Sequence, residues 1–381
     1  MDVFMKIVFI GNYLKDRQES MKRYTDMLYR EFTGLGLNCS IWNPPLFFGS
    51  LYHTTNSGFG KWLGYIDKYI LFPIIISMQR FILFLRGSRV CYHITDHSNA
   101  MYIYFLPIRD TVVTCHDVLA IRGAMGFEDA YCPASPTGVL LQKLILKSIS
   151  KASKVVCVSN FTLLQLRELA GFPKREHWVV IHNPFNASFS PMNSSEASYR
   201  LSSLGIDSEY IFHLGSSLDR KNRALLVRMA NILGDSWNGK IVFAGFPIDS
   251  TLQSIIDECE LNDRVVSVVK PNHESLLALY SSCACFIFPS FSEGFGWPII
   301  EAQSCGAPVL ASCIEPMPEV GGEGALYADP NSPQEFSEKF HYLKNETVKS
   351  NIVSAGFKNV RRFSSNEIIP KYLEIYSQSV E

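Results

Sequence analysis

Short apolar runs alternate with longer stretches of helical periodicity along most of the chain. The runs are apolar at successive positions, a pattern typical of parallel strands that are covered on both faces. We expect helices between them, among them Glu19–Leu35 and Asn160–Leu169, the second with Ser159 as its N-cap. In the first half we interpret six runs as strands, at Lys6–Ile10, Asn38–Trp42, Arg89–Ile94, Thr111–Cys115, Val155–Val158 and Val179–Ile181.

The alternation lapses after Phe185 and then restarts. Asn186–Ala197 is rich in Ser, Asn and Pro, so we place an interdomain linker there. Six further strands are predicted, at Tyr210–Leu214, Lys240–Ala244, Arg264–Val268, Cys285–Pro289, Pro308–Ala311 and Gly324–Tyr327. The sequence therefore predicts two Rossmann-like, doubly wound α/β domains, at 1–187 and 198–364, that face each other across a cleft.

The chain ends in an amphipathic stretch, Glu367–Val380, within the final segment 365–381. Its apolar positions recur at helical spacing, so they need a surface to pack against. We expect this helix to pack back on the first domain.

One stretch, Tyr69–Leu85, is almost wholly apolar. A helix that spans a bilayer needs about 20 apolar residues, and here Pro73, Gln79 and Arg80 break the run. Two alternatives stay open: a helix buried against the domain, or one that rests in a membrane interface through 61–89. We expect the buried arrangement, because the basic positions only hint at a basic face.

Composition narrows the function classes. The chain has 381 residues, enough for two domains, and its 35 Lys and Arg nearly balance its 36 Asp and Glu. That balance disfavours a nucleic-acid binder. Met1–Lys6 lacks the basic start of a secretory signal, which favours a cytoplasmic protein with reduced thiols. We expect most cysteines, Cys313 included, to be buried, and Cys283 and Cys285 lack a partner pair at metal-site spacing.

The strongest chemical signal is the segment Ser290–Ala302, SFSEGFGWPIIEA, which follows an apolar strand and opens a helix. Gly294 and Gly296 let the backbone approach a ligand, and amides at the start of a helix bind phosphate or sugar oxygens. Glu293 and Glu301 can each accept two hydrogen bonds from adjacent hydroxyls. Taken alone, the segment is equally compatible with a glycine turn that holds one capping and one exposed glutamate.

The composite pattern resembles the signature of the family 4 retaining glycosyltransferases, which have the GT-B fold. Two glutamates, separated by seven intervening residues, enclose Gly-Phe-Gly-x-Pro, and Gly306–Ser312, Pro318–Val320 and Gly324–Pro330 follow in the family's order. The likeness is dense over Tyr210–Asp329 and looser over the first half.

The resemblance implies a role for each part of the segment. Glu293 corresponds to the glutamate that contacts the donor sugar near the reacting centre, and Glu301 to the one that binds the ribose hydroxyls. The amides around Gly294, Phe295 and Gly296 would meet the sugar and the diphosphate.

A second cluster, Gly215–Asn222, follows the predicted strand Tyr210–Leu214. Gly215 ends that strand, and Arg220 and Lys221 supply the cations that a diphosphate needs. The family often has Gly-Arg at the start of this loop, but here Ser216 stands at the Arg position. Lys270, after a later strand, corresponds to the loop that commonly touches the base.

In the first domain, His116 and Asp117 directly follow the strand Thr111–Cys115. An imidazole there can bond a sugar hydroxyl or steady charge at the leaving bond, and His116 resembles the family's active-site histidine. Asp96 and His97 follow another strand, where they either line the acceptor side or form a hydrogen-bonded loop.

Gly11 and Asn12 follow the first strand, where the family usually has a Gly-Gly loop. Only one glycine is present here. The charge-rich segment Lys15–Arg23 comes next, and we expect it to shape the choice of acceptor.

The sequence thus predicts a retaining hexosyltransferase that needs no metal and no cofactor besides its nucleoside-diphosphate sugar. The resemblance favours a mannosyl-like donor and a glycan or lipid-linked acceptor in surface polysaccharide synthesis. Two alternatives stay open, a GT-B epimerase or hydrolase and a non-catalytic nucleotide-sugar binder. A NAD-dependent dehydrogenase is disfavoured because no GxGxxG follows the first strand.

Overall fold

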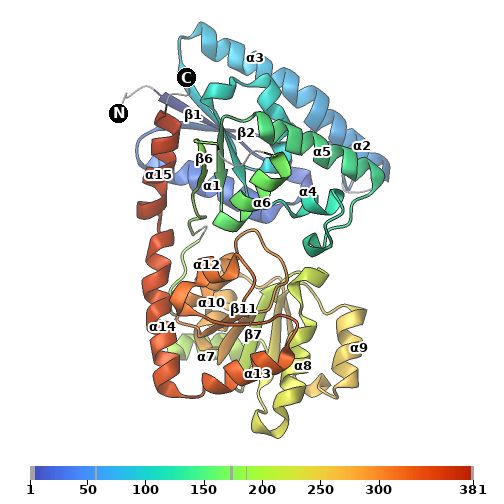
Figure 1. Cartoon of the computed structure of the whole chain (residues 1–381), viewed down its shortest axis with the longest axis vertical. Helices are drawn as coiled ribbons and strands as arrows, with labels where there is room; N and C mark the ends of the chain where they lie inside the picture. The colour runs from blue at the N-terminus through green and yellow to red at the C-terminus, as the bar shows by residue number, and fades with distance from the viewer. Residues whose placement is uncertain (1–4, 56–57, 172–174, 186, 379–381) are drawn as a thin grey trace. The chain divides into compact units, whose positions relative to one another are not determined.

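The computed structural model describes residues 5–55, 58–171, 175–185 and 187–378. Residue 186, at the start of the predicted linker, and residues 379–380, at the end of the predicted last helix, lie outside the described residues. The chain forms two compact units (Figure 1). The first comprises Met1–Phe127, Cys132–Asn186 and Ser365–Glu381, and the second comprises Glu128–Tyr131 and Ala187–Ser364.

Each unit is built on a six-stranded sheet in which every pair of neighbouring strands is parallel. The first sheet has the order β2-β1-β3-β4-β5-β6, from β1 (Met5–Ile10), β2 (Asn38–Trp42), β3 (Arg89–Ile94), β4 (Thr111–Cys115), β5 (Lys154–Cys157) and β6 (Trp178–Val180). The second has the order β12-β11-β10-β7-β8-β9, from β7 (Tyr210–Gly215), β8 (Lys240–Gly245), β9 (Val265–Val269), β10 (Cys285–Phe288), β11 (Val309–Ser312) and β12 (Leu326–Ala328). The predicted doubly wound α/β class is confirmed, with every strand boundary within two residues.

Helices cover the sheets, and the central strands β4, β5, β10 and β11 are buried at every position. The helices of the first unit are α1 (Glu19–Gly34), α2 (Gly58–Ile66), α3 (Phe72–Leu85), α4 (Leu119–Ala124), α5 (Pro136–Lys151), α6 (Asn160–Ala170) and α15 (Ser365–Ser377). Those of the second are α7 (Ser194–Ser203), α8 (Ala224–Leu233), α9 (Ser250–Glu258), α10 (His273–Ser282), α11 (Trp297–Ser304), α12 (Met317–Gly321), α13 (Pro333–Tyr342) and α14 (Glu346–Val360).

Two local predictions can be compared directly. The Ser159 hydroxyl accepts the Thr162 N–H at 3.1 Å, so its role as the N-cap of α6 is confirmed. The predicted linker Asn186–Ala197 is too long, because α7 already begins at Ser194, where the Asn193 side chain caps it.

The C-terminal helix α15 is joined to the first unit by a buried polar network. The Tyr376 hydroxyl lies 2.6 Å from His93 Nδ1, and His93 Nε2 lies 2.7 Å from the Thr114 hydroxyl. The Tyr372 hydroxyl bonds that of Tyr24 in α1. Burial, and then the charge of His116, lowers the pKa of His93 to about 3, so its ring is neutral at physiological pH. The network therefore consists of neutral groups that hold the end of the chain against β3 and β4.

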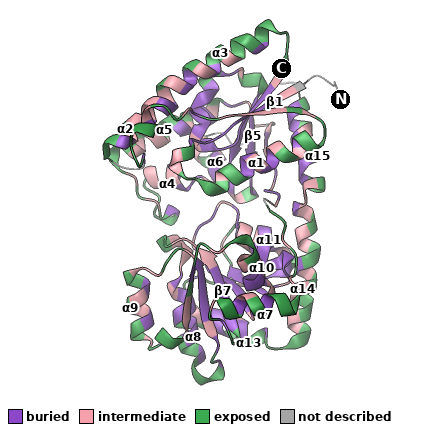
Figure 2. Cartoon of the chain, turned by 180° about the vertical axis from the view of Figure 1, so that it is seen from behind, coloured by how far each residue is buried: buried purple, intermediate pink, exposed green. Residues whose placement is uncertain are grey.

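The apolar stretch forms a continuous helical run, Gly58–Leu85, through α2, a π-helical turn (Asp67–Leu71) and α3. By length and composition this 28-residue run could cross a membrane, although core helices pass the same test. Only 28% of its most apolar window is buried. The predicted burial is therefore wrong for its outer face, which Figure 2 shows as exposed positions along α3.

All ten cysteines are free thiols, and the prediction of burial holds for six of them. Cys313 is exposed, because it follows the carboxyl end of β11 instead of lying within the strand.

Replacing Tyr376 with phenylalanine tests the buried network. We expect Tyr376→Phe to lower the free energy of unfolding of the first unit by about 1–3 kcal/mol, because His93 Nδ1 loses its buried partner. Urea unfolding followed by hydrogen exchange of peptides from β3 and β4 measures that unit alone. The control Tyr342→Phe changes an exposed ring and should alter the free energy of unfolding by no more than about 0.5 kcal/mol. Equal effects of both variants would contradict the network's role.

Candidate functional site

The predicted donor residues gather at the carboxyl edge of the second sheet. Strands β10 and β7 are neighbours, so the loop after each one lies beside the other. The loop after β7 forms a turn, Asp219–Lys221, and the loop after β10 carries Glu293. The Phe291 N–H donates to the Arg220 carbonyl at 2.8 Å, which joins the two loops through their backbones.

Glu293 forms ion pairs with both predicted phosphate-binding cations. Its Oε2 lies 2.8 Å from Arg220 Nη1, and its Oε1 lies 2.5 Å from Lys221 Nζ. Arg220 Nη1 also donates to the Ser292 carbonyl at 2.9 Å. The three side chains form a cluster with one net positive charge, assembled from positions more than 70 residues apart in sequence.

The charge state of Glu293 follows from these contacts. Burial raises the pKa of its carboxyl, but Lys221 and Arg220 together outweigh burial and bring the pKa below its usual value. Glu293 is therefore ionised at neutral pH although only 8% of it is exposed. A buried carboxylate of this kind depends on its two cations to remain charged.

The glycine turn after Glu293 presents backbone to a ligand. Gly296 has a φ of 106° and forms the N-cap of α11, a conformation that other residues rarely adopt. The Phe295 ring is buried against Trp297 and Phe363, with centroids 6.1 and 5.7 Å away. Its side chain points into the core, so a ligand at this turn would meet the backbone around Gly294 and Gly296.

Glu301 lies inside α11 and is buried, so the alternative of an exposed glutamate is wrong. The Tyr280 hydroxyl, from α10, donates to Glu301 Oε2 at 2.9 Å. Burial, and then Glu301, raises the pKa of Tyr280 far above its usual range, so the hydroxyl remains a donor. The tyrosine fixes one carboxylate oxygen and so orients the group.

The same edge continues along β7, β8 and β9. A side chain at Gly215 would meet the His213 ring, and a Cβ on Gly245, whose φ is 106°, would lie 2.8 Å from the Gly215 carbonyl. Lys270 is exposed just after β9, and its N–H donates to the Gly245 carbonyl at 3.0 Å. Sequence reasoning missed Gly245 and Tyr280. The only signal for Gly245 was a glycine directly after an apolar strand.

The acceptor-side residues of the first unit gather in the same way after β1, β3 and β4, which are neighbours in the sheet. Asn12 Nδ2 donates to Asp96 Oδ2 at 2.5 Å, and Asp96 Oδ1 lies 3.5 Å from His97 Nδ1. Asp117 is not part of this cluster, because its carboxylate accepts the Leu119 N–H and stabilises the start of α4.

His116 is held in one orientation. Its Nε2 lies 2.9 Å from the Thr95 carbonyl, which can only accept, so Nε2 carries the proton. The Tyr24 ring packs edge-on against it at 4.6 Å between centroids. Burial lowers the pKa of His116, and Asp96 offsets this only in part, so the imidazole is neutral at physiological pH.

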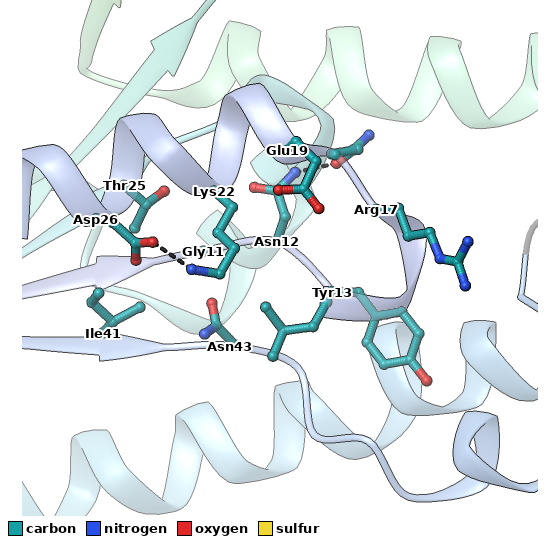
Figure 3. A pocket seen from close by; sticks show the side chains of 12 residues that line it. Gly11, Asn12, Tyr13, Arg17, Glu19, Lys22, Thr25, Asp26, Ile41 and Asn43 are labelled. Carbon is teal, nitrogen blue, oxygen red and sulfur yellow. Dashed lines mark hydrogen bonds and ion pairs between the residues drawn. The ribbon is translucent and has the colours of Figure 1, made fainter. Parts of the chain in front are cut away.

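A pocket of about 130 Å³ lies beside Gly11, between the end of β1 and the start of α1 (Figure 3). A Cβ on Gly11 would collide with the Asn43 side chain, so the single glycine is needed for the close approach. The predicted charge-rich segment contributes several lining residues, whereas Lys15 turns away to the Gly49 carbonyl at 2.6 Å. The pocket is lined by Gly11, Asn12, Tyr13, Leu14, Arg17, Gln18, Glu19, Lys22, Thr25, Asp26, Ile41 and Asn43.

Among residues 5–55, 58–171, 175–185 and 187–378, no group of three or more His, Cys, Asp or Glu side chains could hold a metal ion.

Comparison with known proteins gives this arrangement its context. Residues 202–358 match the family model described as Glycosyl transferases group 1. The chain is 23% identical to O-antigen chain mannosyltransferase B of Escherichia coli, over 98% of this chain and 99% of that protein. The chain is a GT-B glycosyltransferase.

Solved structures agree with this fold. The glycosyltransferase superposes on Anabaena HepE, solved with UDP and glucose, with a TM-score of 0.72 over 98% of this chain and 99% of that one, at 16% identity. It also superposes on WaaG, a glycosyltransferase involved in lipopolysaccharide biosynthesis, with a TM-score of 0.68 over 98% of this chain and 100% of that one, at 13% identity.

The ion pairs of Glu293 predict how the glycosyltransferase binds anions. Glu293→Gln removes the negative charge from the cluster, so inorganic pyrophosphate should bind about three- to tenfold more tightly at low salt, ~1 kcal/mol. Isothermal titration calorimetry measures the affinity, and the gain should shrink as salt rises. The control Glu346→Gln changes an exposed carboxylate elsewhere in the unit and should have no effect. Unchanged or weaker binding by Glu293→Gln would show that the carboxylate does not compete with anions.

Proposed function

We propose that the protein transfers a hexose, with mannose favoured, from a nucleoside-diphosphate sugar to a glycan or lipid-linked acceptor, with retention of configuration. The observation that carries the proposal is the cluster of Glu293, Arg220 and Lys221 beside the glycine turn. The Escherichia coli relative, named as an O-antigen chain mannosyltransferase, supports a mannosyl donor and a role in surface polysaccharide synthesis.

Donor binding follows from the charges of the cluster formed by Glu293, Arg220 and Lys221. A diphosphate would take over Arg220 and Lys221 from Glu293, and the backbone N–H groups at the start of α11 would add further donors. A diphosphate carries more negative charge than one carboxylate, so it would also neutralise the net positive charge of the cluster. Glu293, released from its ion pairs, would turn to the hydroxyls of the donor sugar.

The remaining donor contacts use the rest of the same edge. Glu301, oriented by Tyr280, would bind the ribose hydroxyls. Lys270, after β9, and Gly245, at the end of β8, would flank a base that extends from the ribose. Anabaena HepE, which shares this fold, was solved with UDP and glucose, and this supports a nucleotide-linked donor.

The transfer itself would proceed without an essential metal. Arg220, Lys221 and the helix-start amides would take up the charge of the departing diphosphate, a role that metal ions fill in other enzymes. Retention would follow from attack on the same face that the leaving group vacates, with Glu293 stabilising the positive sugar and forming no bond to it.

In the first unit, the pocket beside Gly11 would receive the acceptor sugar. Asn12, Thr25 and Asp26 offer donors and acceptors to hydroxyl groups, and Arg17 and Lys22 add positive charge (Figure 3). The neutral His116, fixed by Thr95, would bond a sugar hydroxyl near the reacting centre.

A transfer assay with GDP-, UDP-, ADP- and dTDP-hexoses tests the function. We expect transfer from GDP-mannose, an α-linked product by NMR, and activity within twofold in excess chelator. Lys221→Ala should lower kcat/KM at least about tenfold, and the control Lys349→Ala should not, because that lysine is exposed on α14. Free sugar without transfer would indicate a hydrolase, and binding of no donor would refute the proposal.

We further propose that the first unit contacts a membrane through α3. Its exposed apolar residues Ile74, Met78, Phe81 and Leu85 recur at spacings of four, three and four, so they form one outer stripe. The α2 half is fixed to the domain instead, because the buried Asp67 accepts the Tyr13 hydroxyl at 2.7 Å and three N–H groups from residues 47–49. α3 alone, at ~21 Å, is shorter than the ~30 Å hydrocarbon core, which favours an interfacial position.

Vesicle co-sedimentation tests the contact. Wild-type protein should pellet with vesicles that contain phosphatidylglycerol, and Met78→Glu with Phe81→Glu should at least halve the bound fraction, because both substitutions place charge in the stripe. Ile232→Glu, at an exposed apolar position on α8, should bind as the wild type does. Pelleting of the double variant at the wild-type level would contradict the contact.

A further inference from the structure

A cavity of about 330 Å³ lies between α3, the 3-10 helix η4 (His97–Phe105) and α5 in the first unit. Its volume is about twice that of an apolar cavity of about 150 Å³ that stays dry and binds benzene. The wall is built from aromatic and aliphatic side chains. They are those of Tyr69, Pro73, Met101, Tyr102, Tyr104, Phe105, Leu141 and Leu144.

Two cations stand at the rim of the cavity. Arg80 Nη1 donates to the carbonyl of Phe105 at 3.3 Å, and Lys151 Nζ lies 4.7 Å from the centroid of the Tyr104 ring. Both side chains are exposed, so their charged ends can also meet a ligand headgroup.

The surrounding surface is strongly basic, although the whole chain is almost neutral. The segments 58–89, 97–110 and 136–151 contain nine Lys and Arg, of which only Lys68 is buried, and two acidic residues, Asp67, which is buried, and Asp110. Such a surface is complementary to an anionic bilayer. The basic residues are Lys61, Lys68, Arg80, Arg86, Arg89, Arg109, Lys143, Lys147 and Lys151.

The cavity is also continuous with the stripe proposed to contact the membrane. Pro73 belongs to its wall and directly precedes Ile74, the first residue of the outer stripe of α3. A lipid at the contact surface would therefore have an apolar recess beside it.

We propose that this cavity seats one hydrocarbon chain of a lipid from an anionic bilayer, with the headgroup held between Arg80 and Lys151. The site deepens the membrane contact proposed above and rests on it. The recess removes a single chain from the bilayer, and the rim cations keep its headgroup at the membrane surface. A chain held in this way would fix the orientation of the first unit on the membrane, which the apolar stripe alone would leave free.

The polyene fatty acid cis-parinaric acid is a suitable probe, because its fluorescence rises in an apolar site and its carboxylate can meet the rim cations. The wild-type protein should bind it saturably, at one probe per chain. Leu144→Trp fills the mouth of the cavity and should weaken binding at least tenfold. Leu141→Trp also places a ring in the cavity, from the same helix. It serves as a second variant and should weaken binding of the probe in the same way.

The matched control is Leu140→Trp, which adds the same ring at an exposed position of α5 that does not line the cavity. It should bind the probe within twofold of the wild type. Replacing both cations, by Arg80→Gln with Lys151→Gln, should weaken binding of the probe at least threefold. No saturable binding by the wild type, or equal binding by Leu144→Trp and Leu140→Trp, would overturn the proposal.

The vesicle experiment keeps the two proposals apart. If the wild type pellets with anionic vesicles but binds no probe, the cavity has no lipid chain and the contact of α3 still stands. Transfer to a water-soluble acceptor should be unchanged in Leu144→Trp, so a loss of activity there would point to misfolding, which circular dichroism detects.

Discussion

Parallel pairing of strands is the constraint on which the rest of this molecule depends. In a parallel sheet every strand ends at the same edge, so loops far apart in sequence become neighbours there. The loops after β7, β8, β9 and β10 bring together a glycine turn, two cations and two buried glutamates. The loops after β1, β3 and β4 do the same for Asn12, Asp96 and His116 in the first unit. The predicted donor-side residues and the predicted acceptor-side residues are thus each brought together because all strands of their sheet run in the same direction.

The ion pairs at the second edge leave one net positive charge. Arg220 and Lys221 would repel each other if they stood alone, and Glu293 would be costly to bury without them. Their ion pairs join the loops after β7 and β10 and keep the two cations close to one point. In the proposed reaction a diphosphate would replace the carboxylate there, and such preorganisation is a major source of electrostatic catalysis. The carboxylate that pairs with the two cations is the group that the proposal assigns to the donor sugar.

The first unit has two surfaces of different chemistry. Its sheet edge is polar and suits a sugar, whereas the surface of α3, η4 and α5 is apolar and basic. The buried Asp67 and the paired Lys68 hold the start of the long helical run against the domain, and the outer stripe of α3 is left exposed. An enzyme that extends a lipid-linked glycan needs both surfaces on one body, since its acceptor has a polar end and an apolar end.

The sequence by itself determined the two α/β halves, the strand boundaries, the N-cap at Ser159 and the glycine turn before α11. These features depend on hydrophobic periodicity and on local backbone chemistry, which a stretch of ten residues already contains. It also singled out Glu293, Glu301 and Lys221, through a local motif that resembles a known family. Tertiary structure alone decided that Glu293 pairs with two cations more than 70 residues away, that Tyr280 orients Glu301, and that the Asp117 carboxylate accepts the Leu119 N–H. It also decided which face of the apolar helix is exposed, against the expectation of burial. The physical reason is the same in each case: pairing and burial depend on which strands and helices become neighbours, and strand order is set by the packing of the whole sheet rather than by any local pattern.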